Sequence, residues 1–105
     1  MAKVTSLCFI AFFFIIVCSN LVEGNMWCVA QSQASDSVLQ QVLDRLCDKV
    51  DCRAIQPGGS CYNPNTVRNH ASYAIDEYFR IFGVCDTSYA TPSPTDPSFG
   101  TCVYP

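Results

Sequence analysis

The sequence has little charge, one histidine and no run of basic residues, and these shortages exclude several functions. Only 14% of its 105 residues are charged, and His70 is the single histidine. After residue 24 the chain carries five Lys and Arg against eight Asp and Glu, a net charge of −3. Binding to nucleic acid and disruption of anionic membranes both require a basic surface. We therefore expect neither a nucleic-acid partner nor a membrane-active peptide.

The first 24 residues have the features of a secretory signal peptide. A short basic start, Met1–Lys3, precedes an apolar run from Leu7 to Cys18, and Val22 and Gly24 suit the −3 and −1 positions of a cleavage site. A retained signal anchor is the less favoured alternative, because a membrane span needs about 20 apolar residues. We expect no lipid anchor, because residues 101–105 are not a hydrophobic tail. We expect cleavage to leave one soluble, extracellular, monomeric domain at 25–105, without a membrane anchor.

Six cysteines follow the predicted signal peptide, and an even number in a small secreted domain predicts three disulfide bridges. Chains of this size bury a small core and commonly need such links. Structural zinc is the competing use, but it favours short ligand spacings, and the sequence has no Cys-x-x-Cys pair. We expect no metal site. Six cysteines allow fifteen pairings, and spacing alone does not choose among them. The six are Cys28, Cys47, Cys52, Cys61, Cys85 and Cys102.

Two segments have the apolar periodicity of amphipathic helices. Ser35 or Asp36 can cap the first helix, and its apolar side chains recur along one face. The second is predicted to open at Asn63-Pro64, a capping residue followed by proline, and to end before Gly83. The first stripe is Val38, Leu39, Val42, Leu43 and Leu46, and the second is Val67, Ala71, Ala74, Ile75, Tyr78 and Phe82.

The remaining segments are predicted to be mainly loops. Pro57–Ser60 has the composition of a turn, and Thr91–Gly100 contains three of the six prolines. The second of these segments is expected to be extended and exposed between Cys85 and Cys102. Short strands are predicted around Cys61-Tyr62 and Thr101–Tyr104.

Tyr73 suggests a binding surface, because its helical position lies opposite the apolar stripe. Asn69, Asp76 and Arg80 share its side of the helix. An exposed aromatic ring can pack on the apolar face of a sugar, while planar polar groups hydrogen-bond to the sugar hydroxyls. The alternative is a solvated helix face on which Asp76 and Arg80 form an ordinary i, i+4 ion pair.

Catalysis is the less favoured interpretation. Asp76 and Glu77 are adjacent, so on a helix their side chains diverge by about 100°. The spacing of the carboxylates does not exclude a glycosidase, because such an enzyme can recruit its two carboxylates from distant loops. His70 has no nucleophilic cysteine to activate if all six cysteines form bridges, and a hydrogen-bonded structural role is expected for it. We predict that the protein is not an enzyme and has no cofactor.

Four motifs point to a known family. They are Trp27–Ala30, Pro57–Val67, His70–Ala74 and Asp96–Cys102. In this order they resemble the plant X8 domain, which is family 43 of the carbohydrate-binding modules. Members occur as pollen allergens, as plasmodesmal callose-binding proteins and as appendages of β-1,3-glucanases. The resemblance covers essentially the whole chain after the predicted signal peptide.

The resemblance implies a small disulfide-rich α+β fold, mainly α, with two helices, a small antiparallel sheet and long coil segments. It also implies the pairs Cys28–Cys85, Cys47–Cys52 and Cys61–Cys102. The implied function is that of a secreted, non-catalytic protein of the apoplast or cell wall that recognises β-1,3-glucan, either callose or a laminarin-like chain. The alternative is a secreted cysteine-rich signalling or defence protein that uses this scaffold without binding glucan.

The predicted glucan site is an open platform on the outward face of the second helix. The family usually has an aromatic–glycine stretch after its fifth cysteine, where this chain has Asp86–Ala90, and we expect this change to alter glucan binding or to abolish it. Trp27 and Tyr89 are the next candidates should the platform be misplaced. The platform residues are Tyr62, Asn65, Asn69, Tyr73, Asp76 and Arg80.

Overall fold

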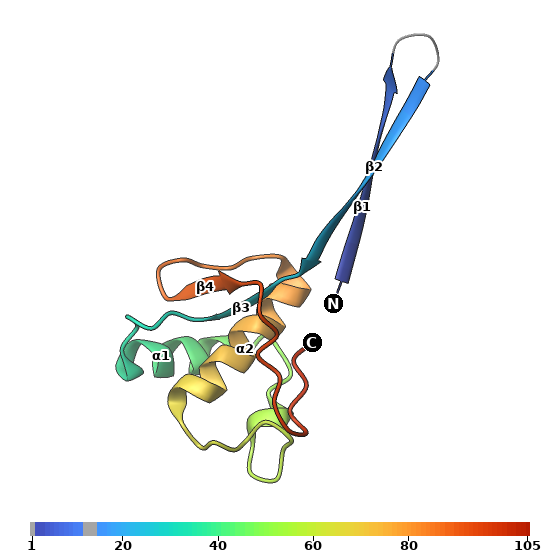
Figure 1. The fold of residues 1–105 in the computed structure, drawn as a ribbon. Helices are drawn as coiled ribbons and strands as arrows, with labels where there is room; N and C mark the ends of the chain where they lie inside the picture. The colour runs from blue at the N-terminus through green and yellow to red at the C-terminus, as the bar shows by residue number, and fades with distance from the viewer. Residues whose placement is uncertain (1, 12–14) are drawn as a thin grey trace.

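The structure is a computed structural model that describes residues 2–11 and 15–105 (Figure 1). Two helices and a two-stranded antiparallel sheet form a small domain, and a separate hairpin precedes it. This confirms the expected α+β class. In chain order the elements are β1 (Ala2–Ala11), β2 (Ile15–Asn25), β3 (Trp27–Ala30), α1 (Asp36–Leu46), the 3-10 helix η2 (Arg53–Ile55), α2 (Val67–Phe82) and β4 (Ala90–Ser93).

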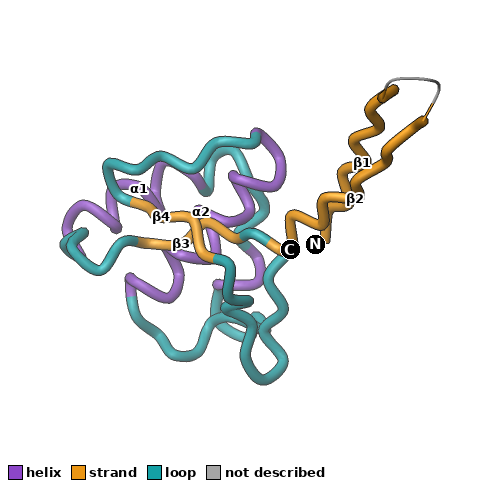
Figure 2. The backbone as a smooth tube through the Cα atoms, turned by 45° about the horizontal axis from the view of Figure 1, so that its top comes forward, coloured by secondary structure: helices purple, strands orange, loops and turns teal. Residues whose placement is uncertain are grey.

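The segment predicted to be the signal peptide contains β1 and β2, which pair antiparallel with each other. Figures 1 and 2 show this hairpin projecting away from the helices. Trp27, the first residue of the next strand β3, belongs to the core of the domain. Cleavage after Gly24 stays a prediction. In the described part of the chain, no helix is both long enough and apolar enough to cross a membrane.

The first helix begins and ends near its predicted limits. Ser35 caps α1 by accepting a hydrogen bond from the Val38 backbone N–H at 3.2 Å, as predicted. The second helix begins later than predicted, because Thr66 rather than Asn63 is its cap and accepts from the Asn69 N–H at 3.1 Å. Gly83 ends α2 with a φ of 72°, a left-handed conformation that glycine adopts at little cost.

The sheet lies elsewhere than predicted. β3 pairs with β4, with Trp27 opposite Ser93 and Ala30 opposite Ala90. The strands predicted around Cys61-Tyr62 and Thr101–Tyr104 are wrong, because in those segments only Cys102 makes a β-bridge, an isolated one. Both real strands are four residues long, too short for a clear alternation of apolar and polar side chains.

The second helix is central to the domain, with α1 packed on one side and β3 on another (Figure 1). The shared core takes side chains from all of these elements. The predicted stripe is partly right, since Ala71, Ala74 and Ile75 are buried. Phe82 was predicted to lie in the core but is 50% exposed, because the stripe continues beyond the end of the packed region.

Three disulfides connect the loops to this core, and their pairing is the one that the resemblance implies. Cys28–Cys85 connects β3 to the segment after α2. Cys47–Cys52 closes the loop after α1, and Cys61–Cys102 connects the loop before α2 to the C-terminal segment. Four of the six bridged cysteines are buried in the core, namely Cys28, Cys52, Cys61 and Cys102. The bridges therefore hold together segments that little regular structure connects.

Candidate functional site

Tyr73 does not lie on the surface, so the prediction of an exposed ring is wrong. Its side chain is 9% exposed and meets Tyr104 edge to face, with ring centroids 5.4 Å apart. The Tyr73 hydroxyl donates to Glu77 Oε1 at 3.3 Å. Burial, together with the charge of Glu77, raises the pKa of Tyr73 to about 12. The C-terminal segment covers this face of α2, which the periodicity of the helix alone had left free.

Asp76 is buried and Arg80 is partly buried, so neither the predicted exposed platform nor the alternative of a solvated ion pair is correct for them. Asp76 is 0% exposed, and its Oδ1 accepts from the Cys28 backbone N–H at 2.9 Å. Arg80 Nε lies 3.7 Å from Asp76 Oδ2 and donates to the carbonyl of Pro105 at 2.9 Å. Burial raises the pKa of Asp76 to about 6, although the Cys28 N–H and Arg80 oppose the shift. These two side chains connect β3, α2 and the C-terminal segment.

Trp27 and Tyr89, the next candidates, are buried as well. The guanidinium carbon of Arg80 lies 5.9 Å from the Trp27 ring centroid, and that of Arg45 lies 5.7 Å from the Tyr89 ring centroid. Both rings therefore stack under arginine side chains within the fold. Neither presents a face to a polysaccharide in this conformation.

The other three platform residues lie together just before and at the start of α2. Asn65 is exposed, and Tyr62 is half-buried. The Asn69 amide is used internally, because its Nδ2 donates to the carbonyls of Cys61 at 2.9 Å and Pro64 at 3.0 Å. The six predicted residues thus do not form one platform. Tyr62 is the member whose ring reaches a hollow in the surface.

An open hollow of about 400 Å³ lies between α1 and the loop before α2. The Tyr62 ring stacks on the His70 ring, with centroids 5.3 Å apart and planes inclined by 26°. His70 Nε2 donates to the Tyr62 carbonyl at 2.7 Å, which confirms the expected hydrogen-bonded, structural histidine. The hollow is lined by Gln40, Leu43, Asp44, Cys47, Ile55, Gln56, Pro57, Tyr62 and His70.

The polar wall of this hollow comes from α1, which the sequence had not assigned to the site. Gln40 Nε2 donates to Asp44 Oδ1 at 2.8 Å, so an amide and a carboxylate stand one turn apart. Both belong to the polar face of the first helix, and their i, i+4 spacing was the available signal. Gln56, from the loop before α2, lines the same hollow, so the Tyr62 ring shares it with two amides and the Asp44 carboxylate. An aromatic ring that shares a hollow with amides suits a neutral ligand rich in hydroxyl groups.

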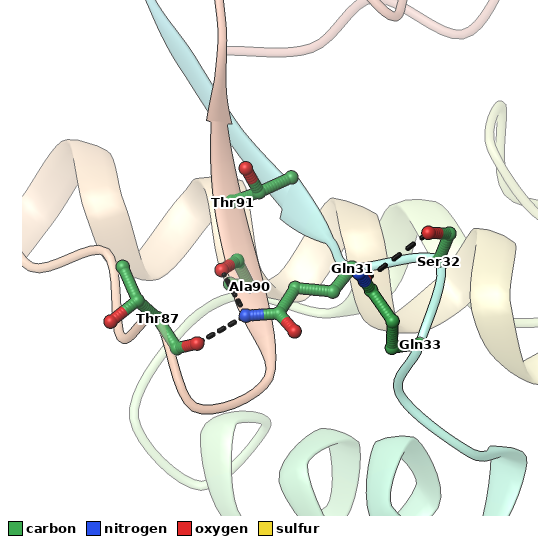
Figure 3. Close-up of a pocket in the computed structure, with 6 residues that line it drawn as sticks. All are labelled: Gln31, Ser32, Gln33, Thr87, Ala90 and Thr91. Atoms are coloured by element: carbon green, nitrogen blue, oxygen red, sulfur yellow. Dashed lines mark hydrogen bonds between the residues drawn. The ribbon is translucent and has the colours of Figure 1, made fainter.

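A second hollow, of about 450 Å³, lies beside the β3–β4 sheet (Figure 3). Gln31 crosses it and donates its amide to the carbonyls of Thr87 and, at 2.9 Å, Ala90. Ser32, Gln33 and Thr91 complete the lining, so it has hydroxyls and amides but no ring on which a sugar could stack. Thr87 belongs to Asp86–Ala90, the stretch that departs from the family pattern. A further hollow surrounds Phe99.

Neither metal chemistry nor an acid–base pair is evident among the described residues. Within 2–11 and 15–105, no group of three or more His, Cys, Asp or Glu side chains is placed to hold a metal ion. Asp44 is the single carboxylate that lines the Tyr62 hollow. Hydrolysis of a glycosidic bond commonly needs two carboxylates that flank the scissile bond.

Comparison with known proteins identifies this architecture. The family model described as "X8 domain" matches residues 26–88. Plasmodesmata callose-binding protein 2 of Arabidopsis thaliana is 42% identical over 85 residues, which are 75% of this chain and 44% of that protein. Major pollen allergen Ole e 10 of Olea europaea is 41% identical over 90 residues, covering 78% of this chain and 73% of the allergen. Glucan endo-1,3-beta-glucosidase 7 of Arabidopsis thaliana is 43% identical over 93 residues, but these are only 18% of its length.

Proposed function

Because the chain belongs to the X8 domain family, we propose that it is a secreted, non-catalytic protein that binds β-1,3-glucan in the plant cell wall. Two relatives from Arabidopsis thaliana are named as callose-binding proteins, and they are 42% and 40% identical to this chain. The chain spans less than half of their length, so their whole activity is carried over here only as a proposal. The three disulfides suit an oxidising extracellular location.

The observation that carries the proposal is the Tyr62 ring. It lines an open hollow together with polar side chains of α1 and of the loop before α2. The His70 ring, which lines the same hollow, stacks on the Tyr62 ring, so Tyr62 loses little conformational freedom when a ligand binds beside it. Gln40 and Gln56 can donate and accept hydrogen bonds with sugar hydroxyls. An open hollow also admits the middle of a polymer, whereas an enclosed pocket would admit only its end.

The proposal that binding is not followed by hydrolysis rests on where the carboxyl groups lie. Asp76 has a raised pKa, the usual mark of a general acid, but it is fully buried and bonded to β3. Glu77 also has a pKa raised by partial burial, and its carboxylate accepts a hydrogen bond from the Tyr73 hydroxyl. At the Tyr62 hollow Asp44 has no carboxylate opposite it among the lining residues. The glucosidase relatives share only about a fifth or less of their length with this chain.

Affinity electrophoresis tests the function directly. The chain secreted by a eukaryotic host should be retarded in a gel that contains laminarin, relative to a blank gel, and should release no sugar from it. N-terminal sequencing of the same sample should begin at Asn25. Equal mobility in the two gels would contradict glucan binding and favour the signalling or defence alternative. Release of glucose or short oligosaccharides by the pure protein would contradict the non-catalytic part.

Tyr62→Leu is the informative variant, because leucine keeps an apolar side chain but removes the planar ring. We expect weaker retardation in laminarin with an unchanged far-ultraviolet circular dichroism spectrum. Tyr78→Leu is the matched control, since Tyr78 is another half-buried tyrosine of the domain but packs against Phe82, with ring centroids 4.5 Å apart. Equal loss of binding in both variants would mean that Tyr62 has no special role.

A further inference from the structure

We propose that the Thr91-Pro92 step of β4 is a glycosylation site, and that its O-linked sugar lies in the hollow beside the β3–β4 sheet (Figure 3). The inference goes beyond glucan binding and rests only on the secretion that the proposed function includes. It starts from the segment Thr91–Ser98, in which every residue is Ser, Thr, Pro or Asp. Secreted segments rich in Ser, Thr and Pro are typical substrates of O-glycosylation.

The structure distinguishes the hydroxyl groups of this segment. Ser93 Oγ accepts from the Thr95 N–H at 3.2 Å, and Ser98 Oγ accepts from a backbone N–H of the C-terminal segment at 2.9 Å. Both of these hydroxyls therefore have a role in the local fold. Thr91 is exposed, and its hydroxyl reaches only the Pro92 carbonyl, at a long 3.4 Å. Because a residue before proline is held extended, Thr91 presents a weakly engaged hydroxyl on an extended chain.

Pro92 lies on the free edge of the sheet. The N–H groups of Cys28 and Ala30 point to α2, away from β4. Pro92 is paired with Cys28, so this is a pair whose backbone groups point away from each other. In the described part of the chain β4 pairs only with β3, and proline has no N–H with which a further strand could pair. The edge therefore stays accessible to a modifying enzyme.

The hollow next to Thr91 has polar groups that suit an attached sugar. It measures about 450 Å³, within the usual range of ligand sites, and Gln31, Ser32 and Gln33 line it together with Thr91. Two backbone carbonyls accept from Gln31 Nε2, so its Oε1 is left to accept from a sugar hydroxyl. Ser32 Oγ donates to Gln33 Oε1 at 3.2 Å, so the NH₂ group of Gln33 is left to donate. None of the lining residues is charged.

The lining has no aromatic ring on which a free sugar would stack, but an attached sugar does not depend on stacking. A covalent bond at Thr91-Pro92 keeps the sugar beside the hollow at a high effective concentration, so a few hydrogen bonds are enough to place it. This hollow shares no lining residue with the Tyr62 hollow. The attached sugar should therefore leave glucan binding unchanged.

Two oxygen atoms at this step can form the bond to the sugar. In the first route Thr91 Oγ1 attacks the anomeric carbon of a nucleotide-activated sugar, the nucleoside diphosphate leaves, and the hydroxyl proton passes to a base of the transferase. In the second route a 2-oxo acid-dependent oxygenase first inserts one atom of dioxygen into a ring C–H bond of Pro92. The other atom enters the carboxylic acid that forms as the 2-oxo acid loses carbon dioxide. The new hydroxyl then takes the sugar in the same way, and hydroxyproline is common in extended chains such as those of collagen.

Mass spectrometry of the chain secreted by plant cells tests the inference. After reduction, trypsin releases residues 81–105 as one peptide, because Arg80 is the last basic residue. We expect this peptide to exceed its sequence mass by one or more sugar units. Fragmentation should place them on Thr91 or, together with one extra oxygen atom, on Pro92. Thr91→Val removes the first acceptor and Pro92→Ala the second, so loss of the sugar in one of these variants identifies the route.

Thr95→Val is the matched control. Thr95 is an exposed threonine of the same segment, but it does not precede proline and does not line the hollow. This variant should keep the sugar, and both threonine variants should be retarded in laminarin gels as the wild type is. Nuclear Overhauser contacts between the sugar and the Gln33 side chain should show that the sugar lies in the hollow.

Each outcome decides one point. An unmodified peptide from secreted protein that is retarded in laminarin would overturn the glycosylation site and leave the proposed function standing. Loss of the sugar in Thr95→Val would overturn the assignment to Thr91-Pro92. An attached sugar without contacts to Gln33 would overturn its place in the hollow. A chain retained inside the cells would overturn the proposed secretion, and the glycosylation site with it.

Discussion

The backbone N–H of Cys28 donates to Oδ1 of Asp76 at 2.9 Å, so a helix side chain takes the place of a neighbouring strand. The next outward-facing N–H of β3, that of Ala30, donates to Ser72 Oγ at 3.1 Å. Four residues of helix rise about 6 Å and two residues of strand about 6.6 Å, so the two spacings match. The edge of β3 that faces away from β4 is therefore covered by α2.

Asp76→Asn should remove a pH dependence of stability. The pKa of Asp76 is raised from 3.8 to about 6 in the folded protein, so between these values the folded state binds more protons than the unfolded state. The stabilisation is complete below about pH 4 and is lost as the pH rises through 6. For a shift of this size the change approaches about 3 kcal/mol. Urea unfolding at pH 4 and pH 7, with the disulfides intact, measures it.

The comparison of the wild type with Asp76→Asn separates the effect of the Asp76 carboxyl group from that of the other carboxyl groups. Asp51, Asp86 and Asp96 have lowered pKa values because of hydrogen bonds to nearby residues, and they act in the opposite direction. Their effect is common to both proteins. Asparagine keeps an oxygen that can accept from Cys28 but does not titrate. Parallel stability profiles for wild type and variant would show that the Asp76 carboxyl is not the cause.

Tyr73→Ala should destabilise the fold by roughly 3–5 kcal/mol, because it removes a buried ring and its contact with Tyr104. Tyr73→Phe keeps the ring and loses only the hydrogen bond to Glu77, so about 1 kcal/mol is expected. Denaturant unfolding of the two variants measures both values. A Tyr73→Ala protein that is as stable as wild type but no longer binds laminarin would restore Tyr73 to the binding site.

Replacing both Cys61 and Cys102 with serine should cost more stability than the same change at Cys47 and Cys52. The bridged residues are separated by 41 positions in the first pair and by 5 in the second. Chain-entropy arguments then give about 4 and about 2 kcal/mol. Thermal unfolding of the two double variants tests the order. Equal losses would mean that the loops are already constrained in the unfolded chain.

Gly59→Ala, in the loop before α2, should lower the free energy of unfolding by about 1–3 kcal/mol, because the added methyl group would press on the backbone of Ala54. The control is Gly58→Ala. Gly58 has a φ of 88° but open space where a Cβ would lie, so only backbone strain is expected there. If Gly59→Ala proves the milder of the two, the close approach to Ala54 is not limiting.

Local signals predicted the features that depend on neighbours in the chain. Ser35 and Gly83 lie at the ends of their helices as expected, because caps and left-handed ends are decided within a few residues. The disulfide pairing followed from the resemblance alone. The predicted start of α2 was three residues too early, since Thr66 and not Asn63 is the N-cap residue.

The exposure of the candidate site residues was harder to predict, because it depends on what covers each helix face. Periodicity assigns one buried face to α2, and on that basis Tyr73, Asp76 and Arg80 were placed outside. β3 and the C-terminal segment bury those residues, and neither contact leaves a periodic signal in the helix. Tyr62, predicted as a platform residue, lines a hollow before α2, and its neighbours there, Gln40 and Asp44, come from the other helix.

The sequence by itself determined the two helices, the N-cap of α1, the glycine that ends α2, the acidic charge and, through its motifs, the family and its disulfides. These properties follow from interactions within a few residues or from a pattern of residue types. Only the tertiary structure decided which aromatic rings remain accessible. Trp27, Tyr73, Tyr89 and Tyr104 are buried, whereas Phe99 remains exposed, and nothing local distinguishes them. The difference arises because segments far apart in the chain, joined by three disulfides, cover some rings and leave others open to solvent.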